Sequence, residues 1–193
     1  MVAQADAAAL ASGADAVLAE RASAGSPGTP LYLHVRSLDD PAALDDVSRA
    51  ASLRPAGVAL ACACGGADVQ RLGARLAVEE ARLGLPDGTL RILAFATQTP
   101  EAVLALPSYR GASARLAGLI VTPVPALLGA PQRLARNLAV IAARAAGVPV
   151  IDASLGDVEG LRAAALSARA DGFDGMAALS VEQVAVVNAA FSS

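Results

Sequence analysis

Short apolar segments alternate with longer amphipathic segments along most of this sequence, and this order constrains the fold more than any other feature. The apolar runs, partly β-branched, lie at residues 14–19, 31–35, 57–63, 92–97, 118–122, 148–153 and 175–179. Helical patterns lie between most of them, at residues 41–53, 67–84, 131–146, 158–170 and 181–191. Strand and helix recur roughly every 25 to 35 residues, as in βα units of a parallel sheet. The sequence therefore predicts an α/β protein.

Residues that favour helix ends support these boundaries. Asp39 and Asp40 precede Pro41, and an Asp cap followed by proline at the first helical position is a common helix start. Gly84 and Gly147 follow two amphipathic patterns, where glycine accepts the left-handed conformation that ends many helices. The connections to the next strands are short, as expected for compact α/β units.

The composition limits the size and the surroundings of the protein. The chain has 193 residues, 55% of them hydrophobic, which suits one domain over residues 1–193. Its mean hydropathy is +0.51, but charges interrupt every apolar stretch before the ~18 residues that a transmembrane helix needs. The N-terminus has no basic segment of the kind that begins a signal peptide. We therefore expect a soluble protein of the cytoplasm that makes no membrane contact.

The charge balance and the few metal-ligand residues disfavour further classes of function. A formal net charge of −3 and a pI near 5.1 give no basic stripe, so we expect no nucleic acid to bind. His34 is the only histidine and lies inside a strand pattern, so we expect an interior histidine rather than part of a catalytic triad. Cys62 and Cys64 stand one residue apart, whereas zinc sites usually use a two-residue gap and four ligands. We interpret them as two small reduced residues on one face of a strand.

Glycine-rich nucleotide-binding loops are absent from the sequence. Neither GxGxxG nor GxxxxGK follows a strand pattern, so no Rossmann fingerprint and no P-loop is predicted. Gly65 and Gly66 follow the strand pattern that contains Cys62, but two glycines alone are weak support for a phosphate cradle. We predict a tight βα turn there.

Several segments resemble those of one enzyme family, and they occur in the same order. Residues 96–119, ATQTPEAVLALPSYRGASARLAGL, are similar to the ATETPxAVF and GSYxGASPRLAGL motifs of the citrate lyase beta-subunit-like proteins, in the HpcH/HpaI aldolase superfamily. Residues 11–17 resemble its ASGADAV segment, residues 54–60 its RPDGVML strand, and residues 172–191 its GFxGKMAIHPAQVxxINEAF ending. The resemblance covers essentially the whole chain.

The resemblance implies a TIM-type barrel with its site at the C-terminal ends of the strands. Enzymes of this family use a divalent ion, usually Mg²⁺, to hold and polarise an oxoacid or acyl-CoA substrate during carbon–carbon cleavage or condensation. One Glu and one Asp bind the ion, because hard cations require oxygen ligands. Family enzymes are commonly trimeric.

Other residues occupy the positions of these two carboxylates in this chain. Gln98 stands at the Glu of ATETP, and Pro125, beside Val124, stands at the Asp of the family's GAEDL segment. A proline side chain cannot bind a metal. Cys62 and Cys64 also replace a lysine and a glutamate of the family pattern. We therefore predict no metal ligands and no cofactor, and we expect Mg²⁺ binding to be lost or weak.

Three polar residues at strand ends are candidates for binding a substrate. Arg36 matches an arginine that faces the substrate in the family, Asp152 also matches, and Gln98 keeps a carbonyl oxygen. Arg36 has an alternative role in a structural ion pair, for which Glu20 on the neighbouring strand is a partner. Asp152 has an alternative role as a cap of the helix that follows Gly156.

The N-terminal region is shorter than the family pattern. Relatives begin with a strand resembling RSLLFVPG, which this chain lacks before its ASGADAV segment, and they carry a helix where residues 20–30 stand here. We therefore expect about seven parallel strands, with the first strand missing and the barrel incomplete. Exposed sheet edges pair readily with other chains, so we expect oligomerisation, or a helix packed over the opening, to protect the edges.

Three functions are compatible with these departures. The first is a noncatalytic relative, a pseudoenzyme, that acts as a binding or partner subunit or a homo-oligomer, with an acyl-CoA or oxoacid as its expected ligand. The second is an active carbon–carbon lyase or aldolase on such a substrate, with a rebuilt site. The third is different chemistry or a structural role on the inherited scaffold. Because fold alone does not fix function, we favour the first and leave the other two open.

Overall fold

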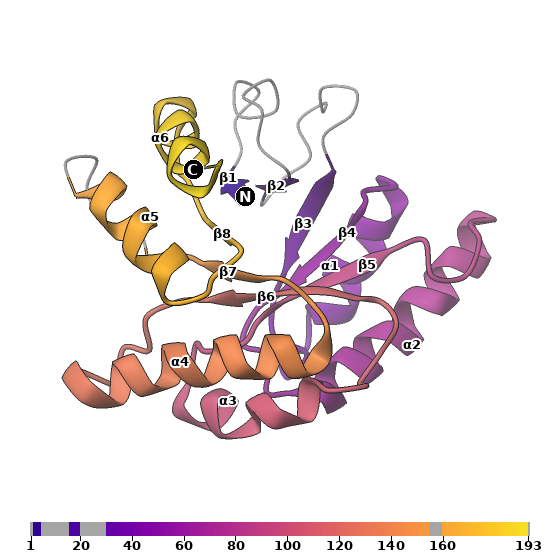
Figure 1. The fold of residues 1–193 in the computed structure, drawn as a ribbon. Coiled ribbons are helices and arrows are strands. Elements are labelled where there is room, and N and C mark those ends of the chain that lie inside the picture. Colours follow the sequence, from indigo (N-terminus) through magenta and orange to yellow (C-terminus); the bar gives the residue numbers. More distant parts are fainter. Residues whose placement is uncertain (1, 5–15, 20–29, 155–159, 193) are drawn as a thin grey trace.

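Parallel strands form one sheet in which each strand pairs with its neighbours in the sequence, in the order β1 to β8 (Figure 1). The computed structural model describes residues 2–4, 16–19, 30–154 and 160–192. The strands in this part of the chain are β1 (Val2–Gln4), β2 (Ala16–Ala19), β3 (Leu31–Val35), β4 (Gly57–Leu60), β5 (Arg91–Phe95), β6 (Leu116–Val121), β7 (Val150–Asp152) and β8 (Gly175–Met176).

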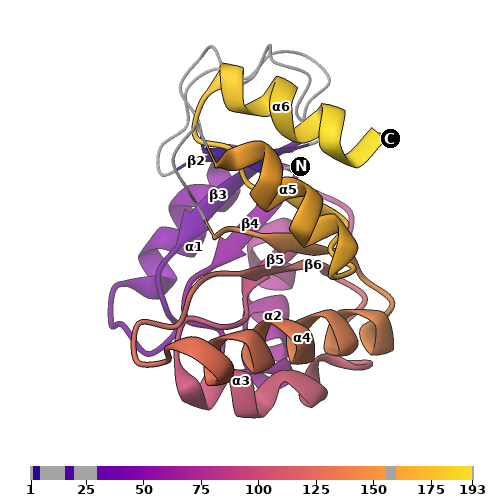
Figure 2. The same cartoon turned by 60° about the vertical axis from the view of Figure 1, so that its left-hand side comes forward.

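Helices follow most of the strands and cover the outer side of the sheet (Figures 1 and 2). They are α1 (Ala43–Ser52), α2 (Gly66–Leu83), α3 (Pro100–Ala105), α4 (Gly129–Ala146), α5 (Leu161–Ala170) and α6 (Val181–Ser192), and α3 continues into the 3-10 helix η2 (Leu106–Tyr109). Within the described ranges, none of these helices has the length and the apolar run that crossing a bilayer requires.

The predicted α/β class is confirmed, and the sheet has the form of an incomplete barrel. The strand count differs from the expected seven, because β1 precedes the strand that was expected to come first. β1 has only three residues, too few to be predicted from an apolar run, and its backbone pairs with β2 from Val2 opposite Ala16 to Gln4 opposite Leu18. In the ranges that the structure describes, no pairing joins β8 to β1. The sheet therefore stays open.

Strand alternation divides the core into an inner and an outer part. Successive side chains of a strand point to opposite faces, so β5 places Leu93 and Phe95 on the inner face and Ile92 and Ala94 on the helix-facing side. The inner cluster consists of Ala59, Leu93, Phe95, Ile120 and Ile151, packed against Tyr32, Ala117 and Ala153. The side chains of this inner cluster therefore fill the space enclosed by the curved sheet.

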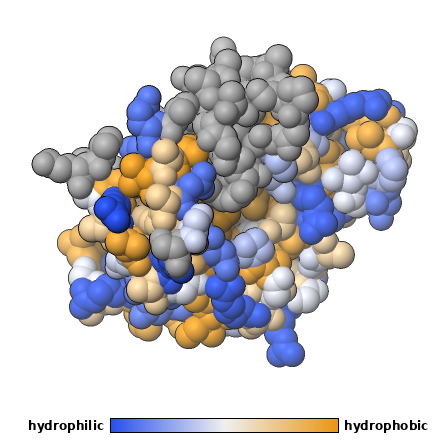
Figure 3. Space-filling view, turned by 45° about the horizontal axis from the view of Figure 1, so that its top comes forward, coloured by the Kyte–Doolittle hydropathy of each residue, from blue (hydrophilic) through white to orange (hydrophobic). Residues whose placement is uncertain are grey.

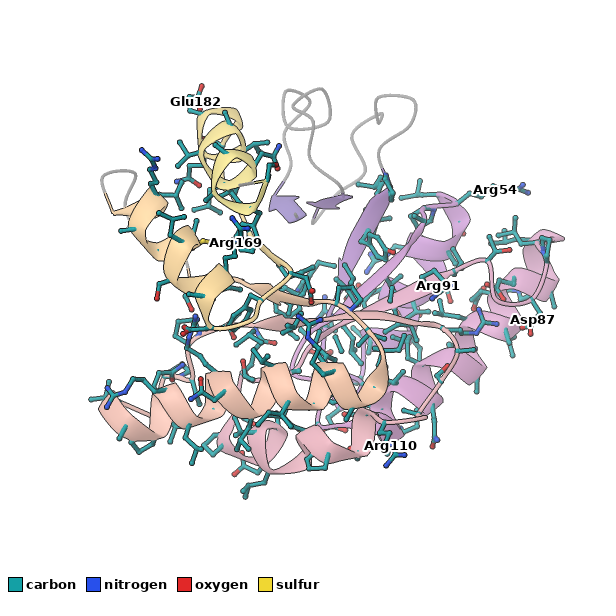
Figure 4. The ribbon with its side chains drawn as sticks, in the orientation of Figure 1. Arg54, Asp87, Arg91, Arg110, Arg169 and Glu182 are labelled. Atoms are coloured by element: carbon teal, nitrogen blue, oxygen red, sulfur yellow. The ribbon has the colours of Figure 1, made fainter. Side chains whose placement is uncertain are left out.

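The C-terminal helices have a small core of their own. Leu161 and Ala165 of α5 pack with Val184 and Val187 of α6. Arg169, labelled in Figure 4, extends from α5 toward α6, and its guanidinium donates a hydrogen bond of 3.0 Å to the carbonyl of Ala190. These contacts hold α6 against α5, and both views place α6 near the N-terminal strand.

Apolar side chains also occur on the surface of the molecule. On the face shown in Figure 3, they form several separate groups among hydrophilic residues. Scattered apolar residues of this kind are normal for a globular protein.

A buried ion pair fixes the loop between α2 and β5. Glu80 is 1% exposed, and each of its carboxylate oxygens accepts a 2.7 Å hydrogen bond from Arg115. The same carboxylate accepts from the backbone N–H groups of Gly88 at 3.0 Å and Leu90 at 2.6 Å. Asp87, labelled in Figure 4, adds a second carboxylate to Arg115. Burial alone raises the pKa of Glu80, but Arg115 and the N–H donors outweigh it, so the pKa lies below its usual value.

We expect Glu80→Gln to lower the free energy of unfolding by about 2–3 kcal/mol at pH 7, because Arg115 would stay buried without its main partner. Because the pKa of Glu80 is lower in the folded than in the unfolded protein, its ionised carboxylate stabilises the fold at pH values above the unfolded-state pKa of about 4.3. This stabilisation is lost as the pH falls through the folded-state pKa. Urea unfolding between pH 7 and pH 3 should therefore show a shallower pH dependence for the variant. Glu101→Gln, at an exposed position on α3, is the matched control. Equal unfolding free energies for Glu80→Gln and the wild type would contradict this role.

Candidate functional site

Polar residues that follow neighbouring strands lie at one edge of the sheet, because the carboxyl ends of parallel strands meet there. Arg36 follows β3, residues 62–64 follow β4, Gln98 follows β5, residues 122–126 follow β6, and Asp152 ends β7. Of the three predicted substrate-binding residues, Gln98 is joined to the segment after β4. Arg36 and Asp152 are bound to residues of the outer helices instead.

The side chain of Gln98 supports the loop between β4 and α2. Its oxygen Oε1 accepts a hydrogen bond of 2.6 Å from the backbone N–H of Cys62. Cys62 has a φ of 49°, in the left-handed region that non-glycine residues rarely adopt. The hydrogen bond therefore stabilises an unfavourable backbone conformation. The role of Gln98 in substrate binding stays a prediction.

Side chains from η2 hold the rest of this loop. The hydroxyl of Tyr109 donates to the carbonyl of Ala63 at 3.0 Å and accepts from the N–H of Gly65 at 3.3 Å, and Ser108 Oγ accepts from the N–H of Gly66 at 2.8 Å. A Cβ atom at Gly65 would lie 2.4 Å from Ser108 Oγ, and the φ of 98° also requires glycine. The predicted tight turn is confirmed. The N–H groups that bind phosphate in glycine-rich loops are engaged by side chains here.

The segment after β6 is fixed by hydrogen bonds between its backbone groups and side chains of neighbouring elements. Thr97 Oγ1 donates to the carbonyl of Thr122 at 2.9 Å and accepts from its N–H at 3.0 Å. Val124 is buried in the helix-facing core, and its N–H donates to Gln132 Oε1 at 2.9 Å. Pro125 is exposed and offers no side-chain donor atom. The loop at the position of the family's aspartate ligand therefore contributes a buried apolar side chain, Val124, to the core.

Asp152 forms a buried ion pair with a residue of α4. It shares a strand face with Val150 of the helix-facing core, whereas Ile151 belongs to the inner cluster. Its oxygen Oδ1 lies 2.8 Å from Arg136 Nη1 and accepts from the N–H of Ser154 at 2.9 Å. The predicted helix cap after Gly156 lies outside the described residues. The role of Asp152 in substrate binding stays a prediction, and the structure gives its carboxylate a partner.

Arg36 pairs with two aspartates near the start of α1. Its side chain is 46% exposed, with Nε 2.5 Å from Asp46 and Nη1 3.3 Å from Asp40. The hydrogen bonds that Arg36 donates to these carboxylates, Asp46 first and then Asp40, raise its pKa. The expected alternative of an ion pair matches this arrangement, but the expected partner Glu20 lies outside the described residues. His34 on β3 is half-buried and packs edge-on against Phe95 with 5.6 Å between ring centroids.

The donor atoms at these strand ends do not fit a divalent metal ion. In the described ranges, no three His, Cys, Asp or Glu side chains lie together in a way that could hold one. Mg²⁺ requires a nearly octahedral set of oxygen ligands, usually with one or two carboxylates. Gln98 is neutral and bound to Cys62, while the one carboxylate that ends β7 is bound to Arg136. The residues present thus disagree with the ion that the family resemblance implies.

Several supporting residues received no role in the sequence analysis. Tyr109 and Thr97 are buried and each makes two hydrogen bonds to backbone groups of a neighbouring loop. The sequence contains only two tyrosines, and one of them stands in the segment with the strongest family resemblance. The rarity of tyrosine in this chain and the position of Tyr109 in that segment were the signals in the sequence that could have indicated its structural role.

We expect Gln98→Ala to leave the N–H of Cys62 without its acceptor and to lower the free energy of unfolding by about 1 kcal/mol, because a half-buried donor loses its hydrogen bond. Amide hydrogen exchange followed by NMR should show faster exchange at Cys62. Gln132→Ala, which removes the acceptor of the Val124 N–H instead, is the matched control and should leave Cys62 protected. Unchanged exchange at Cys62 in Gln98→Ala would show that the hydrogen bond is not formed in solution.

We expect Cys64 to be alkylated slowly at neutral pH. Burial raises the pKa of its thiol, a hydrogen bond with Thr99 lowers it in part, and the charges of Asp68 and Asp39 raise it further. Because the thiolate is the reactive form, alkylation by iodoacetamide in a Cys62→Ser background should be slower than that of glutathione at pH 7 and should accelerate as the pH rises. A rate that is already maximal at pH 7 would contradict this assignment.

Similar proteins were found among solved structures and in neither of the other two comparisons. No model of a protein family matches the sequence, and no curated protein matches it. RipC from Yersinia pestis is 25% identical, with a TM-score of 0.76 over 100% of this chain and 94% of that chain. CitE from Mycobacterium tuberculosis, solved in complex with magnesium, acetoacetate and coenzyme A, is 19% identical, with a TM-score of 0.74 over 100% of this chain and 80% of that chain.

A citrate lyase from Burkholderia xenovorans is also similar. It is 20% identical, with a TM-score of 0.73, over 86% of this chain and 58% of that chain, so this chain spans little more than half of its length. Identities in this range establish a shared fold, and the family resemblance of the sequence motifs agrees with it. The chain has the fold of the citrate lyase beta-subunit-like proteins.

Proposed function

We propose that this chain is a noncatalytic relative of the citrate lyase-like carbon–carbon lyases and acts as a binding or partner subunit. The observation that carries the proposal is the 2.6 Å hydrogen bond between Gln98 Oε1 and the N–H of Cys62. Gln98 Oε1 is the only oxygen of its side chain that could bind a metal ion, and in this hydrogen bond it fixes the loop after β4 instead. A neutral side chain engaged in this way is a poor replacement for a carboxylate ligand.

The second carboxylate position supports the same proposal. Pro125 has no donor atom, and the neighbouring Val124 is buried in the core between sheet and helices. Moving this turn toward a bound ion would expose Val124, which costs about 1.5–3 kcal/mol for a side chain of this kind. A rebuilt metal site at this position therefore requires a rearranged loop as well as new ligands.

A ligand without a metal is compatible with the remaining groups. CitE, which is similar in fold, was solved with acetoacetate and coenzyme A. For this chain we propose an acyl-CoA or oxoacid of the same class, with Arg36 as the residue that approaches its carboxylate or phosphate. Asp46 and Asp40 already offset the charge of Arg36, so we expect such binding to be weak and sensitive to salt.

Isothermal titration tests the loss of the metal. We expect no binding of Mg²⁺ or Mn²⁺ at millimolar concentrations, either alone or with acetyl-CoA or oxaloacetate, and no cleavage of malyl-CoA or citramalyl-CoA. Magnesium binding at millimolar or tighter affinity, or turnover above a sample without protein, would overturn the proposal and favour an active lyase with a rebuilt site.

Restoring the two carboxylates is a sharper test of the same loops. We expect Gln98→Glu combined with Pro125→Asp to bind Mg²⁺ no better than the wild type, because Val124 and Cys62 keep the loops in their present conformations. The matched control combines Gln98→Glu with Pro125→Asn, which adds one charge fewer. Binding by the first variant and not by the control would show that the scaffold still holds the ligand geometry.

A further inference from the structure

Two free thiols lie one residue apart on the loop between β4 and α2. Cys62 is half-buried and Cys64 is exposed. Ala63, between them, buries its side chain in the helix-facing core, whereas the exposure of the two cysteines shows that they lie outside that core. Both side chains are therefore accessible at the edge of the sheet where the strands end.

The segment after β5 contacts both cysteines. Gln98 Oε1 accepts the hydrogen bond from the N–H of Cys62, and the next residue, Thr99, forms a side-chain hydrogen bond with the thiol of Cys64. Burial is the largest cause of the raised pKa of the Cys64 thiol, and the charge of Cys62 adds to it, which requires the two side chains to be near each other. The two thiols thus share one side of the loop.

Hydrogen bonds hold the backbone around the two thiols. The N–H of Ala63 donates to the carbonyl of Phe95 at 3.2 Å, and the carbonyl of Ala63 accepts from the hydroxyl of Tyr109 at 3.0 Å. The N–H of Cys64 donates to Asp68 Oδ2 at 2.8 Å. Because the fold fixes this backbone, a ligand that binds both sulfur atoms has only the two side chains to order.

The chemistry of this pair differs from that of the family's metal site. Cys62 and Cys64 replace a lysine and a glutamate of the family pattern, so a hard, charged pair has become a soft one. Thiolates select soft ions such as Cu(I), which two sulfur atoms bind from opposite sides. Zn²⁺ requires four ligands, and within the described ranges no third His, Cys, Asp or Glu joins the pair. Mg²⁺ requires oxygen ligands, so it does not compete for the sulfurs.

We propose that Cys62 and Cys64 form a binding site for a single soft monovalent metal ion of the Cu(I) class. Each thiol releases its proton to solvent, and each thiolate forms one bond to the ion. Two metal–sulfur bonds of about 2.3 Å place the sulfurs about 4.6 Å apart, a separation that residues i and i+2 reach by rotation about χ1. This inference does not depend on whether the chain is catalytic, because it uses other residues than the family's metal ligands.

Ag(I), a monovalent ion of the same class that is stable in air, tests the site with the wild type. Protein reduced with a phosphine and then desalted is mixed with silver nitrate, and native mass spectrometry counts the bound ions. We expect one Ag(I) per single chain, and we expect this one ion to protect both thiols from iodoacetamide. These two measurements need no variant, so they test the site even where a substitution prevents folding.

Competition with the chelator bicinchoninate measures the affinity for Cu(I) under anaerobic conditions. Cys62→Ser and Cys64→Ser should each lower the affinity by at least about 100-fold, because one of two thiolate ligands is lost. Ala67→Ser, at an exposed position in the first turn of α2, is the matched control and should bind like the wild type. Circular dichroism checks that each variant is folded.

The two methionines are the other soft donors of the chain, and the double variant Cys62→Ser/Cys64→Ser separates their contribution. We expect this variant to retain no ion in competition with bicinchoninate. An ion retained by the double variant, one ion shared between two chains, protection of only one thiol, or binding of Zn²⁺ as tight as that of Cu(I) would each overturn the proposal.

Discussion

The hydrogen bond from the Cys62 N–H to the side chain of Gln98 is the interaction on which the candidate site depends. It joins the loops after β4 and β5 and holds Cys62 in a left-handed conformation. From that conformation the chain turns directly into α2, where Tyr109 and Ser108 engage the next backbone N–H groups. A carboxylate at position 98 in a metal-binding enzyme points to an ion, whereas this amide points to the protein itself. Backbone N–H groups of the loop after β4 are therefore engaged by side chains of the protein itself.

The periodicity of the sequence predicted the long elements well and the short ones poorly. The run at 31–35 coincides with β3, and the pattern at 67–84 differs from α2 by one residue at each end. β1 was missed because three residues give no measurable alternation, and pairing with β2 supplies its stability. α3 was missed because a six-residue helix depends on its surroundings, here on the cap from Thr99 Oγ1 to the N–H of Ala102.

Charge changes at the site were predictable, whereas the partners of its side chains were not. The replacement of acids by Gln98 and Pro125 follows directly from the motifs that surround them. That Asp152 pairs with Arg136 depends on strand alternation and on the packing of α4, and neither is specified by nearby residues. Arg36 was correctly given an ion pair as an alternative, but its observed partners are Asp40, just before α1, and Asp46 within α1. The partner of a side chain depends on how distant segments pack together, so the identity of a residue alone does not predict its partner.

The ion pair between Glu80 and Arg115 lies at the opposite end of the sheet from the candidate site, because it fixes the loop that enters β5. Stability and ligand chemistry are thus carried by separate ends of the same strands. Substitutions at the carboxyl ends leave this anchor untouched. The two ends of the sheet are thus independent in their chemistry: residues at the carboxyl ends, including those at the family's metal-ligand positions, are exchanged without removing the anchor that fixes the entry to β5.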